Sequence, residues 1–359
     1  RLGGNLGPVA RSRTRAGVME RRALRIATYN VEWFHELFDD KGRLLDTNAW
    51  SGRHKVTRAE QIAGLITVFR AMDADGILVV EAPDVSRHRN GAVALATFAR
   101  EAGIRAREVC LGFANDTQQE IMLLYDPDVI RARHAPSDLG APRFDQSFRI
   151  DLDVDATEDV VTFSKPPLEM RLDTPLGVMR MIGVHVKSKA PHGARDPDHA
   201  MKLAIANRRK QLAQCIWLRS RVMAHLDEGE PLILLGDLND GPGLDVFEDL
   251  FGRSGIEIVM GWGEEPRRAL FDPNAARALE RRIMAAPTTA RFYIASEGRY
   301  ISALLDYIMV SPDLRPMARR WRVWHPFEDP DCWENEGLRD ALLAASDHFP
   351  VTLDMVAEG

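Results

Sequence analysis

The stretch PLILLGDLND, residues 231–240, carries the most information about the fold of this chain. Its apolar run lies between Pro231 and Gly236, and a short apolar run with such flanking residues predicts a buried β-strand. The end of the predicted strand carries Asp237, Asn239 and Asp240. Burying a carboxylate at the end of a core strand is unfavourable unless it binds a metal, a cation or a substrate. The stretch therefore predicts a core strand with a functional site at its end.

The same design recurs in five other segments, each an apolar run that carries an acid, an amide or an imidazole near one end. These are Asn30 and Glu32 in IATYNVEW, Glu81 in GILVVEAPD, His185 in MIGVHVK, Asp306 in LLDYIMVS, and Asp347 with His348 in AASDHFPVTL. We expect the six segments to converge on one site. Because they span almost the whole chain, we expect residues 23–359 to form a single domain. Residues 1–22 are expected to be a disordered or leader extension.

The composition is that of an ordinary globular protein. The 359 residues are 45% hydrophobic and carry a formal net charge of -6, which argues against a surface coated for duplex nucleic acid. Three scattered cysteines are too few for a disulfide framework and favour a reduced, cytoplasmic setting. No run of about 18 apolar residues predicts a membrane span. We expect a monomer.

The order of the predicted elements indicates an α/β protein with mixed sheets. Strands and helices alternate in the first third of the chain. Residues 159–186 then predict three successive antiparallel strands, and a long helix is predicted from about residue 198 to residue 224. The long apolar runs predict sheets that are covered on both faces.

The chemistry of the strand-end residues points to phosphoester hydrolysis. Carboxylate and amide oxygens without a nearby thiolate suit Mg²⁺, Mn²⁺ or Ca²⁺ better than structural zinc. His348 needs a carboxylate to fix its tautomer, and Asp306 is available for this. His185 can approach a substrate from another strand. One imidazole would activate water while the other stabilises or protonates the leaving oxygen, and the sequence leaves open which does which.

Six motifs in this order, TYNVEW, VVEAP, GVHVKSK, GDLND, LLDYI and SDHFPV, resemble the endonuclease/exonuclease/phosphatase superfamily, whose members include deoxyribonuclease I. The similarity covers roughly residues 25–353, and its H-x-K-S-K run is similar to that of bacterial members. It implies a four-layer α/β sandwich, in which two packed mixed β-sheets are flanked by helices. It also implies a Mg²⁺-dependent phosphoester hydrolase, with Mn²⁺ as the alternative cofactor.

The resemblance assigns roles residue by residue. It implies that Asn30, Glu81 and Asp347 form the metal site, with Glu81 as the principal ligand. It implies that Asp237 and Asn239 position water and phosphate, that Asp306 orients His348, and that His185 contacts the phosphate. Three positions depart from the family pattern, namely Val80 where Gln is common, Glu32 where several members carry Asp, and Gly183 where many carry Asn or Thr.

The basic residues after His185 divide into two groups. Lys187 and Lys189 are nearest the site and are predicted to bind substrate. Lys202, Arg208, Arg209 and Lys210 fall on the long helix and are predicted to form a solvated face. Asp240 is interpreted as a turn residue.

Three functions remain open from the sequence. The first is a phosphodiesterase or endonuclease-type hydrolase that attacks phosphorus with water. The second is a phosphomonoesterase for a small soluble or lipid-derived phosphate. The third is a catalytically silent binding module of the same fold. A phosphoester substrate is expected in the first two, and nucleic acid is one candidate that the acidic total charge does not favour.

Overall fold

A computed structural model of the chain describes residues 23–113, 115, 119–151, 159–191, 193–241, 252–280, 287–294 and 298–357. The extension predicted over residues 1–22 lies outside the described residues. Among the helices that are described, none is both long enough and apolar enough to cross a membrane.

Within the described residues, the first sheet has the strand order β14-β15-β1-β2-β4-β3. The strands are β1 (Ala23–Asn30), β2 (Gly76–Pro83), β3 (Glu108–Leu111), β4 (Gln119–Tyr125), β14 (Ala318–Val323) and β15 (Val351–Val356). β1 and β2 are parallel, and the other neighbours are antiparallel. Asn30 and Glu81 therefore lie at the same end of this sheet.

The second sheet has the order β13-β10-β9-β8-β5 in the described part of the chain. Its strands are β5 (Arg131–His134), β8 (Leu168–Thr174), β9 (Gly177–His185), β10 (Leu232–Asp237) and β13 (Asp306–Val310). β9 and β10 are parallel, and the other pairs are antiparallel. The apolar run of PLILLGDLND thus forms an interior strand, β10, as predicted.

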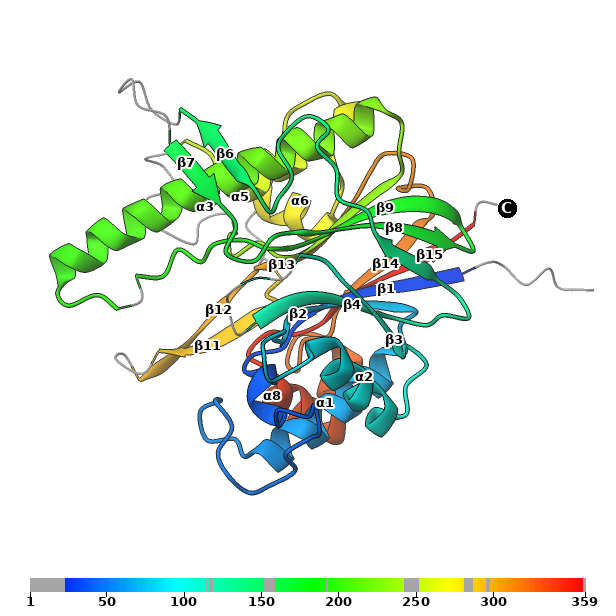
Figure 1. Ribbon diagram of the computed structural model, residues 1–359, viewed down its shortest axis with the longest axis vertical. Coiled ribbons are helices and arrows are strands. Elements are labelled where there is room, and N and C mark those ends of the chain that lie inside the picture. The colour runs from blue at the N-terminus through cyan, green and yellow to red at the C-terminus, as the bar shows by residue number, and fades with distance from the viewer. Residues whose placement is uncertain are drawn as a thin grey trace, which may run out of the picture.

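The two sheets pack face to face between two layers of helices (Figure 1). Helices α1 (Arg58–Met72), α2 (Gly91–Ala102) and α8 (Glu336–Ala345) pack against the first sheet, and α3 (Pro197–Asp227), α5 (Gly255–Met260) and α6 (Pro273–Leu279) pack against the second. Apolar side chains of both sheets, among them Leu78, Met181 and Ile233, form the central core. The predicted four-layer α/β sandwich with two mixed sheets is confirmed.

Side-chain alternation explains why both faces of each sheet are apolar. In β2, Ile77 and Val79 pack into the core beneath the helices of the first sheet, whereas Leu78 and Val80 pack into the central core. Successive side chains of a strand point to opposite faces, so a continuous apolar run serves two cores at once. The side chains of β10 divide in the same way between the central core and the core beneath α3.

In the part of the chain that the structure describes, two short strand pairs lie outside the sandwich sheets. They pair β6 (Ser147–Ile150) with β7 (Asp159–Thr162), and β11 (Ala290–Ile294) with β12 (Arg299–Ala303). The prediction of three successive antiparallel strands over residues 159–186 is therefore wrong in one respect, because β8 pairs with β9 but β7 pairs with β6. Pro166 and Pro167 separate β7 from β8, and proline cannot donate a ladder hydrogen bond.

The remaining short elements of the described residues are η1 (Phe34–Leu37), η2 (Pro266–Arg268) and α7 (Pro330–Glu334). The long predicted helix is α3, which begins after the N-cap Asp196, whose side chain accepts a hydrogen bond from the backbone N–H of His199. A proline at the first helical position, Pro197, reinforces this start.

Strand register brings three predicted site residues to one level of the second sheet. Asp237 on β10 lies opposite His185 on β9 and opposite Asp306 on β13. Gly236 permits this close approach, because it has a φ of 133° and a Cβ atom there would overlap the Val184 carbonyl oxygen. The glycine of the GD motif is therefore a steric requirement of the strand end.

Candidate active site

Asp237 is buried at the end of β10 and connects the two sheets. Its Oδ2 accepts a hydrogen bond from the Asn30 amide on β1 at 2.9 Å. Its Oδ1 accepts one from the backbone N–H of Asn239 at 2.7 Å. Asn239 has a φ of 49°, a left-handed conformation that asparagine adopts more readily than most residues. Burial raises the pKa of the Asp237 carboxyl to about 7.

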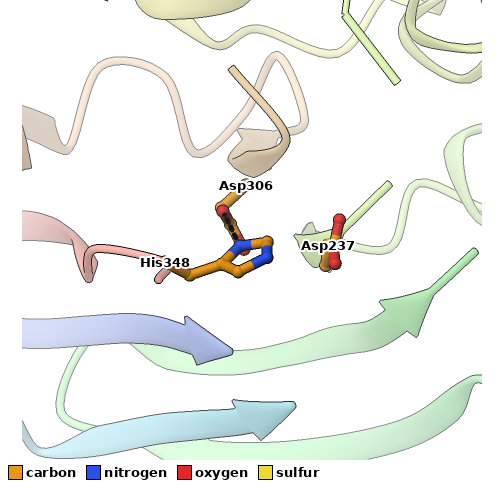
Figure 2. A group of neighbouring side chains, drawn as sticks. All are labelled: Asp237, Asp306 and His348. Atoms are coloured by element: carbon orange, nitrogen blue, oxygen red, sulfur yellow. Dashed lines mark hydrogen bonds and ion pairs between the residues drawn. The ribbon is translucent and has the colours of Figure 1, made fainter. Parts of the chain in front are cut away.

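His348 and Asp306 form a hydrogen-bonded pair that faces Asp237 (Figure 2). His348 Nδ1 lies 2.8 Å from Asp306 Oδ2, so Nε2 is the nitrogen that remains for chemistry. Burial by itself would lower the pKa of His348, but the carboxylates of Asp306 and Asp237 outweigh it and raise the pKa well above its usual value. One ligand atom from each of the three residues lies within 4.8 Å of the others.

Glu81 occupies a β-bulge near the end of β2. The register with β4 shifts between Val80 and Ala82, and Glu81 has a φ of 60°. Such backbone strain in a residue other than glycine clusters at functional sites. The carboxylate accepts a hydrogen bond from the side-chain amide of Gln119 on β4. Support for Glu81 therefore comes from the neighbouring strand β4.

Lys165 lies in the site although no sequence motif predicted it. It precedes β8, and its Nζ lies 3.1 Å from His185 Nδ1 and donates a hydrogen bond to Gln119 Oε1 at 2.5 Å. His185 Nε2, on the other side of the ring, lies 3.7 Å from Asp237 Oδ2 and 3.9 Å from Glu81 Oε1. Burial lowers the pKa of His185 well below its usual value, and the Lys165 charge adds to this effect.

Glu32 lies at the edge of the same cluster. Its carboxylate accepts a hydrogen bond from the Arg53 guanidinium at 2.7 Å. Burial raises the pKa of Glu32 to about 7, and the nearby charge of Asp347 adds to it. Ser346 connects the two segments, because its hydroxyl donates to the Asn30 carbonyl oxygen at 2.8 Å and accepts from the Glu32 N–H at 3.1 Å. Glu32 is therefore part of the acidic cluster and not an isolated surface acid.

A model of the Endonuclease/Exonuclease/phosphatase family matches residues 27–348, a range that contains every predicted site residue. The chain belongs to this family. Membership makes the protein a phosphoric ester hydrolase. No curated protein matches the chain at a significant level.

Several solved structures are similar to the chain at low sequence identity. TDP2 from C. elegans is 11% identical with a TM-score of 0.49, and the match covers 94% of this chain and 77% of that chain. A 3'-5' exonuclease (NExo) from Neisseria meningitidis is 14% identical with a TM-score of 0.47, over 92% of this chain and 99% of that one. An endonuclease/exonuclease/phosphatase family protein from Bacteroides thetaiotaomicron is 14% identical with a TM-score of 0.46, over 95% and 100%.

The acidic end of the site in this family member has the donor atoms that a divalent cation requires. Asn30 Oδ1 and Asp347 Oδ1 are buried and have no hydrogen-bond partner among the described residues. Burial raises the pKa of Glu81, and the charge of Asp347 adds to it, so the acids lie close together. Hard oxygen donors in a negatively charged cluster fit Mg²⁺ or Mn²⁺.

The two lysines predicted to bind substrate lie in different environments. Lys187 is half-buried. The pKa of His185 is lowered first by burial of the ring, then by the charges of Lys165 and His348, and also by the charge of Lys187. Lys187 therefore lies near the site. Lys189 instead forms an ion pair with Asp240, with Nζ 2.6 Å from Oδ1. The structure therefore places Lys189 in an internal network.

Asp240 is the centre of that network and not a simple turn residue. It is fully buried and accepts hydrogen bonds from Lys189, from Arg208 at 2.9 Å and from the backbone N–H of Gly241. Arg208 is only 1% exposed, so its predicted place on a solvated helix face is wrong. The physical reason is that a buried carboxylate requires a charged partner.

Proposed function

We propose that the protein is a metal-dependent phosphodiesterase that hydrolyses its substrate by attack of water on phosphorus. The observation that carries this proposal is the cross-sheet cluster, in which the His348–Asp306 pair faces Asp237 while His185 approaches from β9. We also propose that the protein acts as a monomer.

In this proposal the residues of the cluster have distinct catalytic roles. Asp237 and Asn239 orient the attacking water and the scissile phosphate, and the Asn30 amide holds Asp237 in position. His348, fixed by Asp306, exchanges a proton with a reacting oxygen through Nε2. His185 directs Nε2 to the same centre from the neighbouring strand.

Asn30, Glu81 and Asp347 would hold the Mg²⁺ or Mn²⁺ ion. When bound, the ion would neutralise phosphate charge and polarise the phosphorus–oxygen bond. The unpartnered oxygens of Asn30 and Asp347 support this assignment.

The β11–β12 hairpin supports a single-stranded nucleic acid as the substrate. Its base adjoins the site, because the Arg291 N–H donates to the Asp347 carbonyl oxygen at 2.7 Å and the Phe292 ring lies 5.4 Å from the His348 ring. Tyr293 and Tyr300 are 38% and 48% exposed, and their ring centroids are 5.1 Å apart.

An arginine and a histidine lie among these rings. The Arg291 guanidinium lies 3.7 Å from the centre of the Tyr300 ring and forms no carboxylate ion pair among the described residues. His54 stacks on Tyr293 at 4.6 Å. Exposed aromatic rings interleaved with cations are the surface on which bases stack while the phosphates are neutralised. We give this local surface more weight than the acidic net charge of the chain, and it favours a single-stranded nucleic acid as substrate.

The catalytic assignment is tested with bis-p-nitrophenyl phosphate in Mg²⁺. We expect His348→Ala and Asp237→Asn each to lower kcat by about a hundredfold or more, with thermal unfolding little changed. The exposed residues His88 and Asp313 provide the matched controls His88→Ala and Asp313→Asn. Near-full activity of both site variants would refute the assignment. Faster hydrolysis of the monoester p-nitrophenyl phosphate would favour a phosphomonoesterase instead.

The metal assignment is tested by a Mg²⁺ titration of Glu81→Gln. We expect half-maximal activity at a Mg²⁺ concentration about tenfold higher or more, because a ligand charge is lost. Glu101→Gln, on the exposed face of α2, is the control. A titration that matches that of the unmodified protein would remove Glu81 from the metal site.

The substrate is tested by fluorescence anisotropy in EDTA with a labelled single-stranded oligonucleotide and its duplex. We expect tighter binding of the single strand, and we expect Tyr293→Ala and Tyr300→Ala each to weaken it about 5- to 150-fold, since base stacking contributes about 1–3 kcal/mol. Val178→Ala, at the opposite end of β9, is the control. Equal binding by all variants would exclude the hairpin as the binding surface.

A further inference from the structure

Lys165 makes two contacts that converge on the proposed site. Its Nζ lies 3.1 Å from His185 Nδ1 and 2.5 Å from Gln119 Oε1, and Gln119 in turn donates to Glu81. Burial lowers the pKa of Lys165, while the carboxylates of Glu81 and Asp237 oppose this and favour the charged form. Nζ of Lys165 thus lies between an imidazole nitrogen and an amide oxygen.

The chemistry of these partners determines the tautomer of the histidine. A lysine ammonium has three N–H donors and no acceptor. His185 Nδ1 must therefore accept the hydrogen bond, and the proton of the neutral ring must lie on Nε2. We infer that Lys165 is a positioning residue that holds His185 in the Nε2–H tautomer and so makes it a hydrogen-bond donor to the substrate.

This inference rests on the proposed function and sharpens it. His185 Nε2 lies 3.7 Å from Asp237 Oδ2 and 3.9 Å from Glu81 Oε1, so its N–H points into the space between the water-orienting carboxylate and the metal-site carboxylate. A donor there stabilises negative charge on a phosphate oxygen. Because Nδ1 is occupied by Lys165, His185 does not take the proton from water. Proton exchange with a reacting oxygen then belongs to His348.

The tautomer can be measured without substrate. In the full chain labelled with ¹⁵N-histidine, long-range proton–nitrogen correlation spectra near pH 7.5 distinguish the two ring nitrogens, and the His185 signals are assigned by their loss in His185→Ala. We expect Nε2–H in the unmodified protein and in Lys165→Arg, which keeps a donor. We expect Lys165→Met to shift His185 toward Nδ1–H or a mixture. An Nδ1–H ring in the unmodified protein, or an unchanged ring in Lys165→Met, would overturn the inference.

A double-mutant cycle separates positioning from direct substrate contact. We expect Lys165→Met to lower kcat about 10- to 100-fold, as does the loss of other residues that orient a functional histidine. We expect Lys165→Arg to recover much of this loss. In a His185→Ala background the same substitution should cost less than about threefold, because Lys165 then has no imidazole to hold. Equal losses in both backgrounds would show that Lys165 acts on the substrate itself.

One control completes the cycle. Lys202→Met removes an exposed lysine on α3 and should change neither the tautomer nor kcat. Because the spectra need no activity, a protein without phosphodiesterase activity would refute the proposed function while leaving the tautomer measurable.

Discussion

Asp272 is a buried carboxylate with a structural role. It precedes α6 and accepts hydrogen bonds from the backbone N–H groups of Asn274, Ala275 and, across the sheet edge, Ile308. Burial raises its pKa to about 6, although these hydrogen bonds lower it. Asp272 therefore connects α6 to the strand that carries Asp306.

This shifted pKa predicts a pH dependence of stability. The folded state binds a proton with a pKa of about 6, whereas the unfolded state binds it near the ordinary value of 3.8. The folded state holds more protons between these values, so stability falls as pH rises from about 4 to about 6. At about 1.4 kcal/mol per pKa unit, we expect a decrease of about 3 kcal/mol.

Urea unfolding of the unmodified protein and of Asp272→Asn measures this effect. The difference between their free energies of unfolding should change with pH only in that window. Asp313→Asn, on the surface, should follow the unmodified protein. A difference that does not vary between about pH 4 and about pH 6.5 would contradict the assigned pKa.

At the residue scale, the site residues that lie at the end of a strand could be predicted from the sequence. The residues whose position depends on tertiary packing could not. Asp237 and His348 were predictable because each adjoins an apolar run in a recurring motif. Lys165 lies in a loop without periodicity, and only the packing of that loop against β9 brings it to His185. Arg208 has the spacing of a solvated helix face, and its burial depends on Asp240, which is remote in sequence.

At the scale of the elements, Gly183 controls the distance between the sheets. A Cβ atom at Gly183 would overlap Leu78 Cδ1 on β2. The strand of His185 therefore requires glycine at this position. We expect Gly183→Ala to lower stability by about 1–3 kcal/mol through overpacking.

The partner substitution tests this explanation. Leu78→Ala by itself leaves a cavity in the core, but it should cost less stability in the Gly183→Ala background, with a coupling free energy of at least about 0.5 kcal/mol. Gly337→Ala, in α8, meets only Asn335 Oδ1 at 3.6 Å and is the control for adding a methyl group. Strictly additive effects in chemical denaturation would show that the two residues do not constrain each other.

Sequence patterns predicted the main strands and helices of the sandwich. They did not predict local irregularities such as bulges and the pairing of short strands. The bulge that gives Glu81 its φ of 60° leaves no mark in GILVVEAPD, which has the pattern of a regular strand. The partner of β7 was also missed, because pairing depends on where the chain turns after the strand. Both features result from contacts between segments.

At the scale of the molecule, we propose that residues 23–359 form one cooperative domain. The site requires both sheets, since the Asn30–Asp237 hydrogen bond crosses between them. Loss of activity in urea should therefore coincide with loss of tryptophan fluorescence and circular dichroism, in a single transition. Two transitions, or inactivation well before unfolding, would contradict a single domain.

The position of β15 has a consequence for protein synthesis. β15 lies between β14 and β1. β1 therefore lacks one of its two neighbouring strands until residues 351–356 have been synthesised. His348 is made just before them. While the ribosome is still translating residues before this point, the nascent chain already carries Asn30, Glu81 and His185 but lacks the imidazole that completes the site. The growing polypeptide is therefore expected to remain hydrolytically silent until this late segment emerges.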